Sequence, residues 1–126
     1  MKKIISSNKA PRAIGPYSQA VLAGNLLFIS GQLPLDPESM KIKGATAAEQ
    51  AEQVFKNIDA ILKEAGLGFN HVAKMTVLLK DMADFTAVNE VYARQFTGDY
   101  PARAAYQVGA LPMGALVEIE AIAVIQ

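Results

Sequence analysis

Two stretches of this chain carry apolar residues at the period of an α-helix. Residues 47–65 place Ala, Val, Phe, Ile and Leu three or four positions apart, which predicts one continuous apolar stripe. Thr46 and Glu49 have the spacing of a capping box at its start, and Gly66 suits its end. A second helix is predicted from Asp81, as its N-cap, through Phe96, because apolar side chains recur on one face between them. Each helix therefore has one face to bury.

Strand patterns occur before, between and after these helices. Lys2–Ser6 is predicted as a short edge strand, and a Gly-Asn turn at residues 24 and 25 predicts a hairpin of Tyr17–Ala23 with Leu26–Ser30. Val72–Lys80 is a β-branched, apolar run between the two helices. The resulting order is ββ-α-β-α-ββ, closed by two β-like runs after residue 100.

The last two runs, within Tyr100–Gln126, are separated by a Gly/Pro-containing turn at residues 109–114 and predict a C-terminal hairpin. Alternation in the second run assigns the apolar residues from Val117 onward to the core, with Glu118 and Glu120 on the other side. In the first run, Ala104, Tyr106 and Val108 are assigned to the core and Arg103 faces away. A hairpin would then place Arg103 and Glu120 on one face, with Cβ atoms about 5 to 8 Å apart, unless a bulge shifts the register. From the residues alone, a structural ion pair of Arg103 with Glu118 or Glu120 is an equal alternative.

This pattern predicts an α/β (α+β) fold, a two-layer sandwich in which two helices cover one face of a mixed sheet. The 126 residues fit a single domain, 1–126. Two helices leave the other face of the sheet uncovered. On that face, Thr76 and Glu120 are expected beside four apolar side chains, those of Phe28, Leu78, Ile122 and Val124. Such a mixed face is poorly suited to bulk water. We therefore expect an isologous or cyclic homo-oligomer with polar pockets between its subunits.

The composition narrows the classes of function. The chain has no cysteine, one histidine (His71) and a formal net charge of zero, and no Lys/Arg run exceeds two residues. Disulfides and thiol chemistry are excluded, and neither a nucleic-acid partner nor an anionic membrane surface is expected. No His/Asp/Glu cluster has metal-ligand spacing, so no metal site is expected. No apolar run has the length of a signal peptide or a membrane span, which predicts a cytoplasmic protein.

Six motifs in order resemble one known family, the Rid family of YjgF-like reactive intermediate deaminases. They are GPYSQAV at 15–21, FISGQLPLDP at 28–37, FKNIDAILKEAG at 55–66, VNEVY at 88–92, YPARAA at 100–105 and EIEAIAV at 118–124. The resemblance covers nearly the whole chain. It implies a chorismate-mutase-like fold and a homotrimer with active sites in the clefts between subunits. It also implies cofactor-free hydrolysis of 2-imino acids, such as 2-iminobutanoate and 2-iminopropanoate, or their enamine tautomers, to 2-oxo acids and ammonia.

The resemblance also implies roles for individual residues. Arg103, in the PAR motif, is expected to bind the substrate carboxylate, and Glu120, in the EIEA motif, to hold the hydrolytic water. Glu118 competes with Glu120 on the same face, and only the motif match prefers Glu120. The positions Tyr17, Ser30, Gly31 and Asn89 are expected near the ligand. Many relatives have Cys where this chain has Ala105, whose backbone N–H is still available to a carboxylate.

These roles agree with simple chemistry. A guanidinium fork holds a carboxylate through two parallel hydrogen bonds, and a second carboxylate can orient and partly deprotonate water. A protonated imine is reactive enough that orientation and proton transfer suffice without a cofactor. Two other interpretations remain: a non-catalytic trimer that binds small carboxylates such as 2-oxo acids, and a protein-interaction module.

Overall fold

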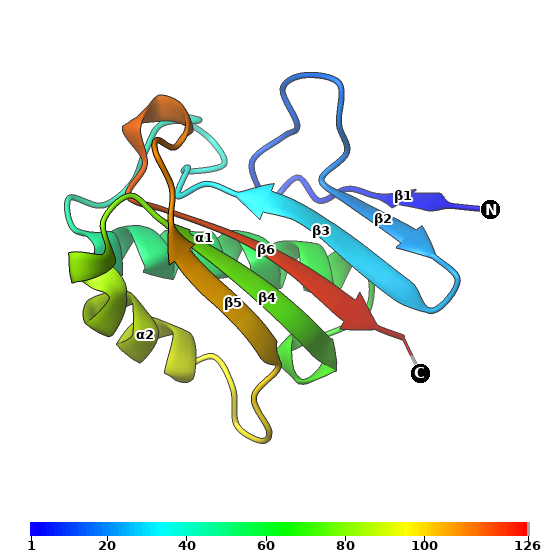
Figure 1. The fold of residues 1–126 in the computed structure, drawn as a ribbon. Coiled ribbons are helices and arrows are strands. Elements are labelled where there is room, and N and C mark those ends of the chain that lie inside the picture. The colour runs from blue at the N-terminus through cyan, green and yellow to red at the C-terminus, as the bar shows by residue number, and fades with distance from the viewer. Residues whose placement is uncertain (126) are drawn as a thin grey trace.

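The computed structural model describes residues 1–125, and its two helices lie together on one face of a six-stranded sheet (Figure 1). The strands are β1 (Lys3–Ile5), β2 (Ala20–Ala23), β3 (Leu26–Gln32), β4 (Val72–Leu79), β5 (Ala102–Gln107) and β6 (Val117–Val124). The helices are α1 (Ala47–Glu64) and α2 (Phe85–Ala93), with short 3₁₀ turns η1 (Phe69–His71), η2 (Met82–Asp84) and η3 (Pro112–Gly114). The predicted two-layer α/β architecture is confirmed, and the element order is βββ-α-β-α-ββ, which differs from the predicted order only by the short edge strand β1, predicted separately, at the start.

The strand order in the sheet is β1-β2-β3-β6-β4-β5, in which only the β4–β5 pair is parallel. The predicted C-terminal hairpin is therefore wrong, because β4 lies between β5 and β6. The sequence of β4 explains its central place, since buried apolar side chains occupy alternate positions along most of its length. The β4-α2-β5 unit is a parallel crossover that leaves β5 at the edge of the sheet.

Local signals account for the helices. The Thr46 hydroxyl accepts a hydrogen bond from the Glu49 N–H, and the Glu49 carboxylate accepts one from the Thr46 N–H, so the predicted capping box is confirmed. Asp81 caps η2 rather than α2, because its carboxylate accepts from the Ala83 N–H at 2.9 Å. The helix α2 ends at Ala93, short of the predicted Phe96. None of the helices in the described part of the chain has the length and apolar character needed to cross a membrane.

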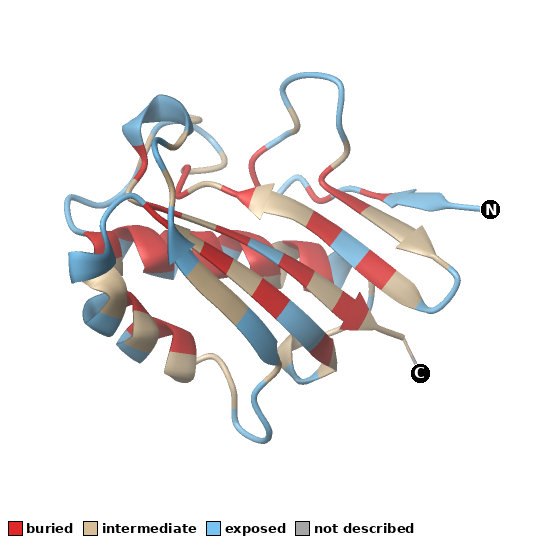
Figure 2. Ribbon diagram, in the orientation of Figure 1, coloured by how far each residue is buried: buried red, intermediate tan, exposed pale blue. Residues whose placement is uncertain are grey.

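The core lies between α1, α2 and the sheet, and its buried residues form stripes along the central strands (Figure 2). Two buried amides on α1 tie nearby loops to this core. Asn57 donates to the carbonyls of Leu33 (3.1 Å) and Leu35 (3.0 Å), and Gln50 accepts from the Leu116 N–H at 2.8 Å. The loop after β3 and the start of β6 therefore have fixed positions relative to the helix layer.

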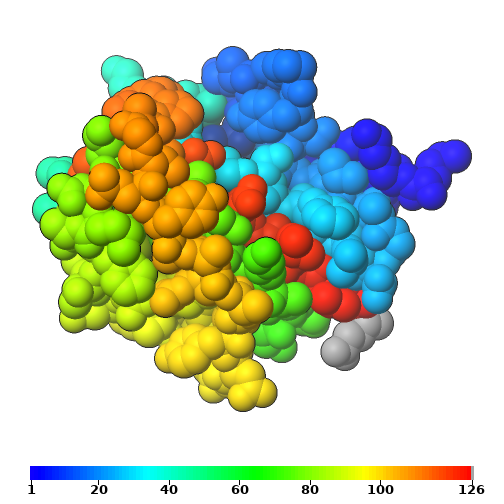
Figure 3. Space-filling view, viewed as in Figure 1, coloured from blue at the N-terminus to red at the C-terminus, as the bar shows by residue number. Residues whose placement is uncertain are grey.

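No helix of residues 1–125 covers the other face of the sheet, which Figure 3 shows in space-filling form. Phe28 is 42% exposed on this face and Tyr106 is 51% exposed. Leu78, Ile122 and Val124 are only partly buried. The expected mixed, uncovered face is thus present, and its burial by further copies of the chain stays a prediction.

Candidate active site

Arg103 and Glu120 lie on opposite faces of the sheet. Arg103 is in register with Met75 of β4, which is fully buried beneath the helices, whereas Glu120 is in register with Thr76 on the uncovered face. The prediction that the two side chains share a face is therefore wrong. It assumed a hairpin, and it assigned the faces of β5 from a weak alternation in which Ala occurs on both sides.

The helix α2 holds the Arg103 side chain. Its Nη1 donates to the Asn89 Oδ1 at 2.6 Å, and its guanidinium carbon lies 4.7 Å from the centre of the Tyr92 ring and 5.4 Å from that of Phe85. Stacking on aromatic faces and one hydrogen bond fix the plane of the guanidinium. The ion pairs found within residues 1–125 involve Lys63 and Arg94, not Arg103. The alternative of a structural ion pair with Glu118 or Glu120 is therefore absent, and the cation is available to an anionic ligand.

A cavity of about 440 Å³ adjoins this guanidinium. Its lining residues come from α2 and from the segment that enters β5: Asn89, Tyr92, Ala93, Tyr100, Pro101 and Arg103. Burial raises the pKa of the Tyr92 phenol, an effect that the neighbouring Arg103 charge partly opposes. The Tyr92 hydroxyl is buried and has no hydrogen-bond partner among the described residues, so the ring beneath Arg103 acts through its face.

Tyr17 and Gly31 lie in a different cavity, of about 420 Å³, together with Glu118. Arg12 and Gln32 are the other polar residues that line this cavity. The remaining wall is apolar and consists of Pro11, Ile14, Leu33, Leu35, Met40, Pro112 and Met113. A predicted pair of ligand contacts, Tyr17 and Gly31, is thus brought together. The carboxylate beside them belongs to Glu118 and not to Glu120.

A β-bulge in β3 produces this arrangement. Ile29 pairs with Ala121 and Gln32 pairs with Ile119, so Ser30 and Gly31 together oppose the single residue Glu120. A Cβ built on Gly31 would overlap the Glu118 carboxylate. Glycine at this position therefore allows the carboxylate to lie directly against the backbone of β3.

We expect Gly31→Ala to displace the Glu118 carboxylate and to lower activity while leaving the fold intact. The clash falls on the end of a flexible side chain, so the protein has a way to relieve it by moving Glu118. If this carboxylate takes part in the reaction, the loss in kcat should reach about tenfold or more, because a small displacement of a reacting group is costly. Gly98→Ala is a matched control, since nothing lies within 4 Å of a Cβ at that position. Equal activity of the two variants would contradict a role for the Gly31 contact.

The environment of Glu118 changes its acidity. Burial raises the pKa of its carboxyl group above the usual value, and the nearby negative charge of Glu120 raises it further. A carboxylate with a raised pKa accepts a proton more readily near neutral pH. Among the residues that line its cavity, Glu118 is the one suited to take a proton from water.

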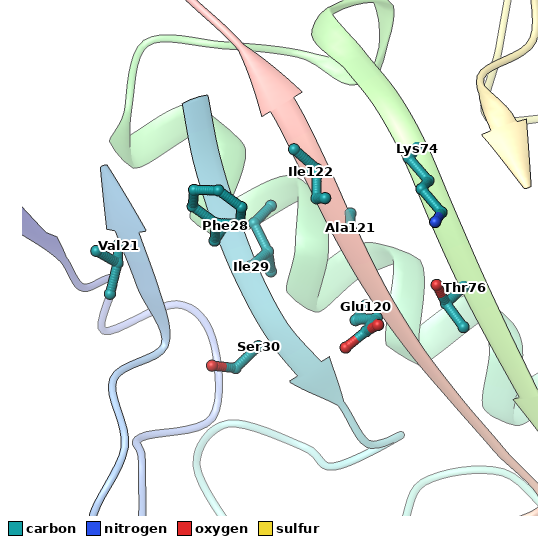
Figure 4. Close-up of a pocket in the computed structure, with 9 residues that line it drawn as sticks. All are labelled: Val21, Phe28, Ile29, Ser30, Lys74, Thr76, Glu120, Ala121 and Ile122. Carbon is teal, nitrogen blue, oxygen red and sulfur yellow. The ribbon is translucent and has the colours of Figure 1, made fainter. Parts of the chain in front are cut away.

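Glu120 lines a third cavity, of about 280 Å³, on the uncovered face (Figure 4). Ser30 and Thr76 flank it there, and Lys74 lies on the β4 side. The Ser30 hydroxyl is engaged elsewhere, because it donates to the Ser18 carbonyl at 2.6 Å. The predicted residues Ser30 and Glu120 are therefore neighbours, but in a chain by itself they lie apart from the Arg103 cavity.

The other two predicted residues lie with Arg103. Asn89 lines the same cavity, although its amide oxygen is already bonded to the guanidinium. Ala105 lies two positions further along β5 in register with Val77, on a strand that has a sheet neighbour on one side only. Sequence reasoning missed Phe85 and Tyr92 as partners of Arg103, because their role depends on how α2 packs on β5.

Comparison with known proteins identifies the family. Residues 7–125 match the family model described as Endoribonuclease L-PSP. The chain is 57% identical to the 2-iminobutanoate/2-iminopropanoate deaminase of Mus musculus, over 98% of this chain and 92% of that protein. Its fold matches the crystal structure of RidA from Psychrobacter sp. PAMC 21119 with a TM-score of 0.93 and 51% identity, covering 98% of this chain and 99% of that one.

A further solved structure, E. coli TdcF with bound serine, matches with a TM-score of 0.94 and 43% identity, covering 98% of this chain and 99% of that chain. These matches extend over the strands and helices that carry all three cavities. The protein therefore belongs to the Endoribonuclease L-PSP family, the Rid family that its sequence motifs resemble.

Proposed function

We propose that this protein hydrolyses reactive 2-imino acids, such as 2-iminobutanoate and 2-iminopropanoate, or their enamine tautomers, to 2-oxo acids and ammonia. The observation that carries the proposal is the stacked, hydrogen-bonded guanidinium of Arg103, which has no acidic partner within residues 1–125. This is a preorganised receptor for the carboxylate that every 2-imino acid carries. The names of its relatives, at more than half identity, support the same activity.

We further propose that each active site forms between two subunits of a homotrimer. Arg103 lies on the edge strand β5 and on the helix-covered face, whereas Glu118 lies on β6, across β4 from β5, and lines a separate cavity. A small substrate cannot reach both groups of one chain. In a cyclic trimer, the Arg103 edge of one subunit can meet the Glu118 cavity of the next, which gives three equivalent sites. Light scattering should report three chains, and a monomer at micromolar concentration would contradict this assembly.

In this site, Arg103 binds the substrate carboxylate and thereby fixes the imine carbon. A water molecule held by Glu118 attacks that carbon, and Glu118 takes one of the water protons as the C–O bond forms. In the protonated imine, the nitrogen receives that proton and leaves as ammonia, while the second water proton is released to solvent from the hydroxyl group as the C=O bond forms. One C=N bond and one water thereby become one C=O bond and ammonia, and the proton of the protonated imine is returned. The sequence motif favoured Glu120 for the water, but the cavity shared with Tyr17 and Gly31 favours Glu118.

The other predicted residues take supporting roles in this proposal. Tyr17, which is half-exposed and lines the Glu118 cavity, contacts the ligand. Asn89 orients Arg103 through its 2.6 Å hydrogen bond. The backbone N–H of Ala105 adds a donor for the carboxylate near Arg103. Ser30 forms, together with Gly31, the bulge that lies opposite Glu120.

The proposal is tested by coupling this protein to a pyridoxal-phosphate-dependent threonine dehydratase. In a buffer that does not itself hydrolyse the intermediate quickly, the purified protein should accelerate the release of 2-oxobutanoate. Calorimetry with 2-oxobutanoate provides the second readout. Binding of 2-oxobutanoate without any acceleration would instead support the non-catalytic carboxylate-binding trimer.

Tyr92→Leu is expected to weaken substrate binding more than turnover. The leucine removes the aromatic face that lies 4.7 Å from the Arg103 guanidinium and leaves the Asn89 hydrogen bond in place. Loss of one cation–π contact should raise KM about threefold to tenfold, with a smaller change in kcat. Tyr92→Phe keeps the ring face and removes only the unpaired hydroxyl, so its KM should stay near the wild-type value. A KM that rises equally in both variants would contradict the stacking role.

A further inference from the structure

A second guanidinium borders the cavity that contains Glu118 and Tyr17. It belongs to Arg12, which lies in the segment between β1 and β2 and is distinct from the Arg103 group. Arg12 is exposed and lines both this cavity and a neighbouring polar cavity, so the residue lies at the border between the two. The ion pairs within residues 1–125 do not involve it. The positive charge of Arg12 therefore has no role in the proposed reaction.

The backbone that carries Arg12 is held in place by a buried glutamine. Gln19 is 3% exposed, and its Nε2 donates to the carbonyls of Ser7 at 3.0 Å and Pro11 at 2.8 Å. Its Oε1 accepts from the Ser7 N–H at 2.7 Å. These hydrogen bonds fix the position of the backbone at Pro11. Arg12 follows Pro11 directly, so its backbone has a defined position beside the cavity.

The cavity between the two polar ends is aliphatic. Glu118, Tyr17 and Gly31 gather where water would attack, whereas Ile14 and Met113 supply apolar wall. Its volume of about 420 Å³ is within the size range of sites that hold much larger ligands than an ethyl group. A ligand that fills it would place methylene groups on the aliphatic wall and a polar group of negative charge at Arg12.

We propose that Arg12 binds a second, distal carboxylate, so that dicarboxylic 2-imino acids with short acidic side chains are substrates of this protein. This inference rests on the proposed function, and it assigns the α-carboxylate to Arg103 and the distal carboxylate to Arg12. The reaction is unchanged: one water and one C=N bond give one C=O bond and ammonia. The reactions that supply such substrates are those that oxidise acidic amino acids to their imines.

The test compares two imines made in place by amino-acid oxidases, one from glutamate and one from 2-aminobutanoate. Semicarbazide traps each imine, and the protein lowers the yield of semicarbazone in proportion to its activity. The wild-type protein should act on both imines. Arg12→Gln should lower kcat/KM about tenfold for the dicarboxylic imine, the loss of one charge-assisted contact, and less than about twofold for the other. Lys9→Gln removes a charge from the same loop outside the cavity and should change neither.

The outcomes separate this inference from the proposed function. Hydrolysis of the imine of 2-aminobutanoate without hydrolysis of the dicarboxylic imine overturns the role of Arg12 and leaves the proposed function standing. An equal loss on both substrates in Arg12→Gln also overturns it, because Arg12 would then act on the common part of the substrate. Failure of the wild type on both imines overturns both. Arg12→Lys keeps a charge at the rim and should retain part of the dicarboxylic activity.

Discussion

Arg103→Ala is expected to lower kcat/KM for 2-iminobutanoate about a hundredfold or more, without changing the fold or the oligomeric state. The variant removes the bidentate receptor for the carboxylate, so the substrate loses both binding energy and its orientation toward the water. Arg103→Lys should recover little of this loss, because an ammonium group lacks the planar fork that stacks on Tyr92 and Phe85. Initial rates in the dehydratase-coupled assay measure the effect.

Arg94→Ala is the matched control for that variant. Arg94 follows α2 directly and forms an exposed ion pair with Glu52 at 3.5 Å, outside the Arg103 cavity. Its loss should leave kcat/KM within about twofold of the wild type. If Arg103→Ala and Arg94→Ala are equally active, Arg103 is not the carboxylate receptor.

If Arg103 and Glu118 of one active site belong to different subunits, Arg103→Ala can also be used to test that arrangement in mixed trimers. In a trimer assembled from Arg103→Ala and Glu118→Gln chains, some sites combine the intact arginine of one chain with the intact glutamate of another. Random assembly of equal amounts should restore about a quarter of the sites, because each site draws one group from each of two neighbours. Co-expressed, differently tagged chains provide the mixed trimers. No recovery of activity would place both groups in one chain.

Local signals in the sequence were sufficient for the helix α1 and for the strand β6. Thr46 and Glu49 are three residues apart, and the capping box they predict forms because both hydrogen bonds are local. The strand β6 alternates strongly enough that Ile119 and Ala121 are buried while Glu118 and Glu120 face the other way, as predicted. These features depend on neighbours within a few positions along the chain.

The features that failed depend on contacts between distant segments. The position of β4 between β5 and β6 is set by packing of the whole sheet, and no local pattern in residues 100–126 reports it. The face of Arg103 was misassigned because alanines occupy both sides of β5 and because the guanidinium packs on the aromatic rings of α2. The bulge at Ser30 and Gly31 carries no strong sequence signature, yet it decides which glutamate meets Gly31.

Glu118→Gln is the second variant with a large expected effect. It removes the group proposed to take the proton from water and should lower kcat about a hundredfold, within the range typical of general bases. Glu120→Gln removes a carboxylate from the neighbouring cavity and should stay within about fivefold of the wild type. Both substitutions keep the shape of the side chain, so circular dichroism and the oligomeric state should not change. If Glu120→Gln lost activity and Glu118→Gln retained it, Glu120 would be the residue that holds the hydrolytic water, as the sequence motif suggested.

The pH dependence of kcat/KM separates the two glutamates further. The proposed base must be ionised, so activity should fall as the pH decreases through the pKa of Glu118. Because burial and the Glu120 charge raise that pKa, the fall should occur at a higher pH than for an ordinary glutamate. Glu120→Gln removes a nearby negative charge, which makes the ionised form of Glu118 less unfavourable and lowers its pKa. The acidic limb of the Glu120→Gln profile should therefore move to lower pH, whereas an acidic limb that stays in place would show that the two carboxylates do not interact.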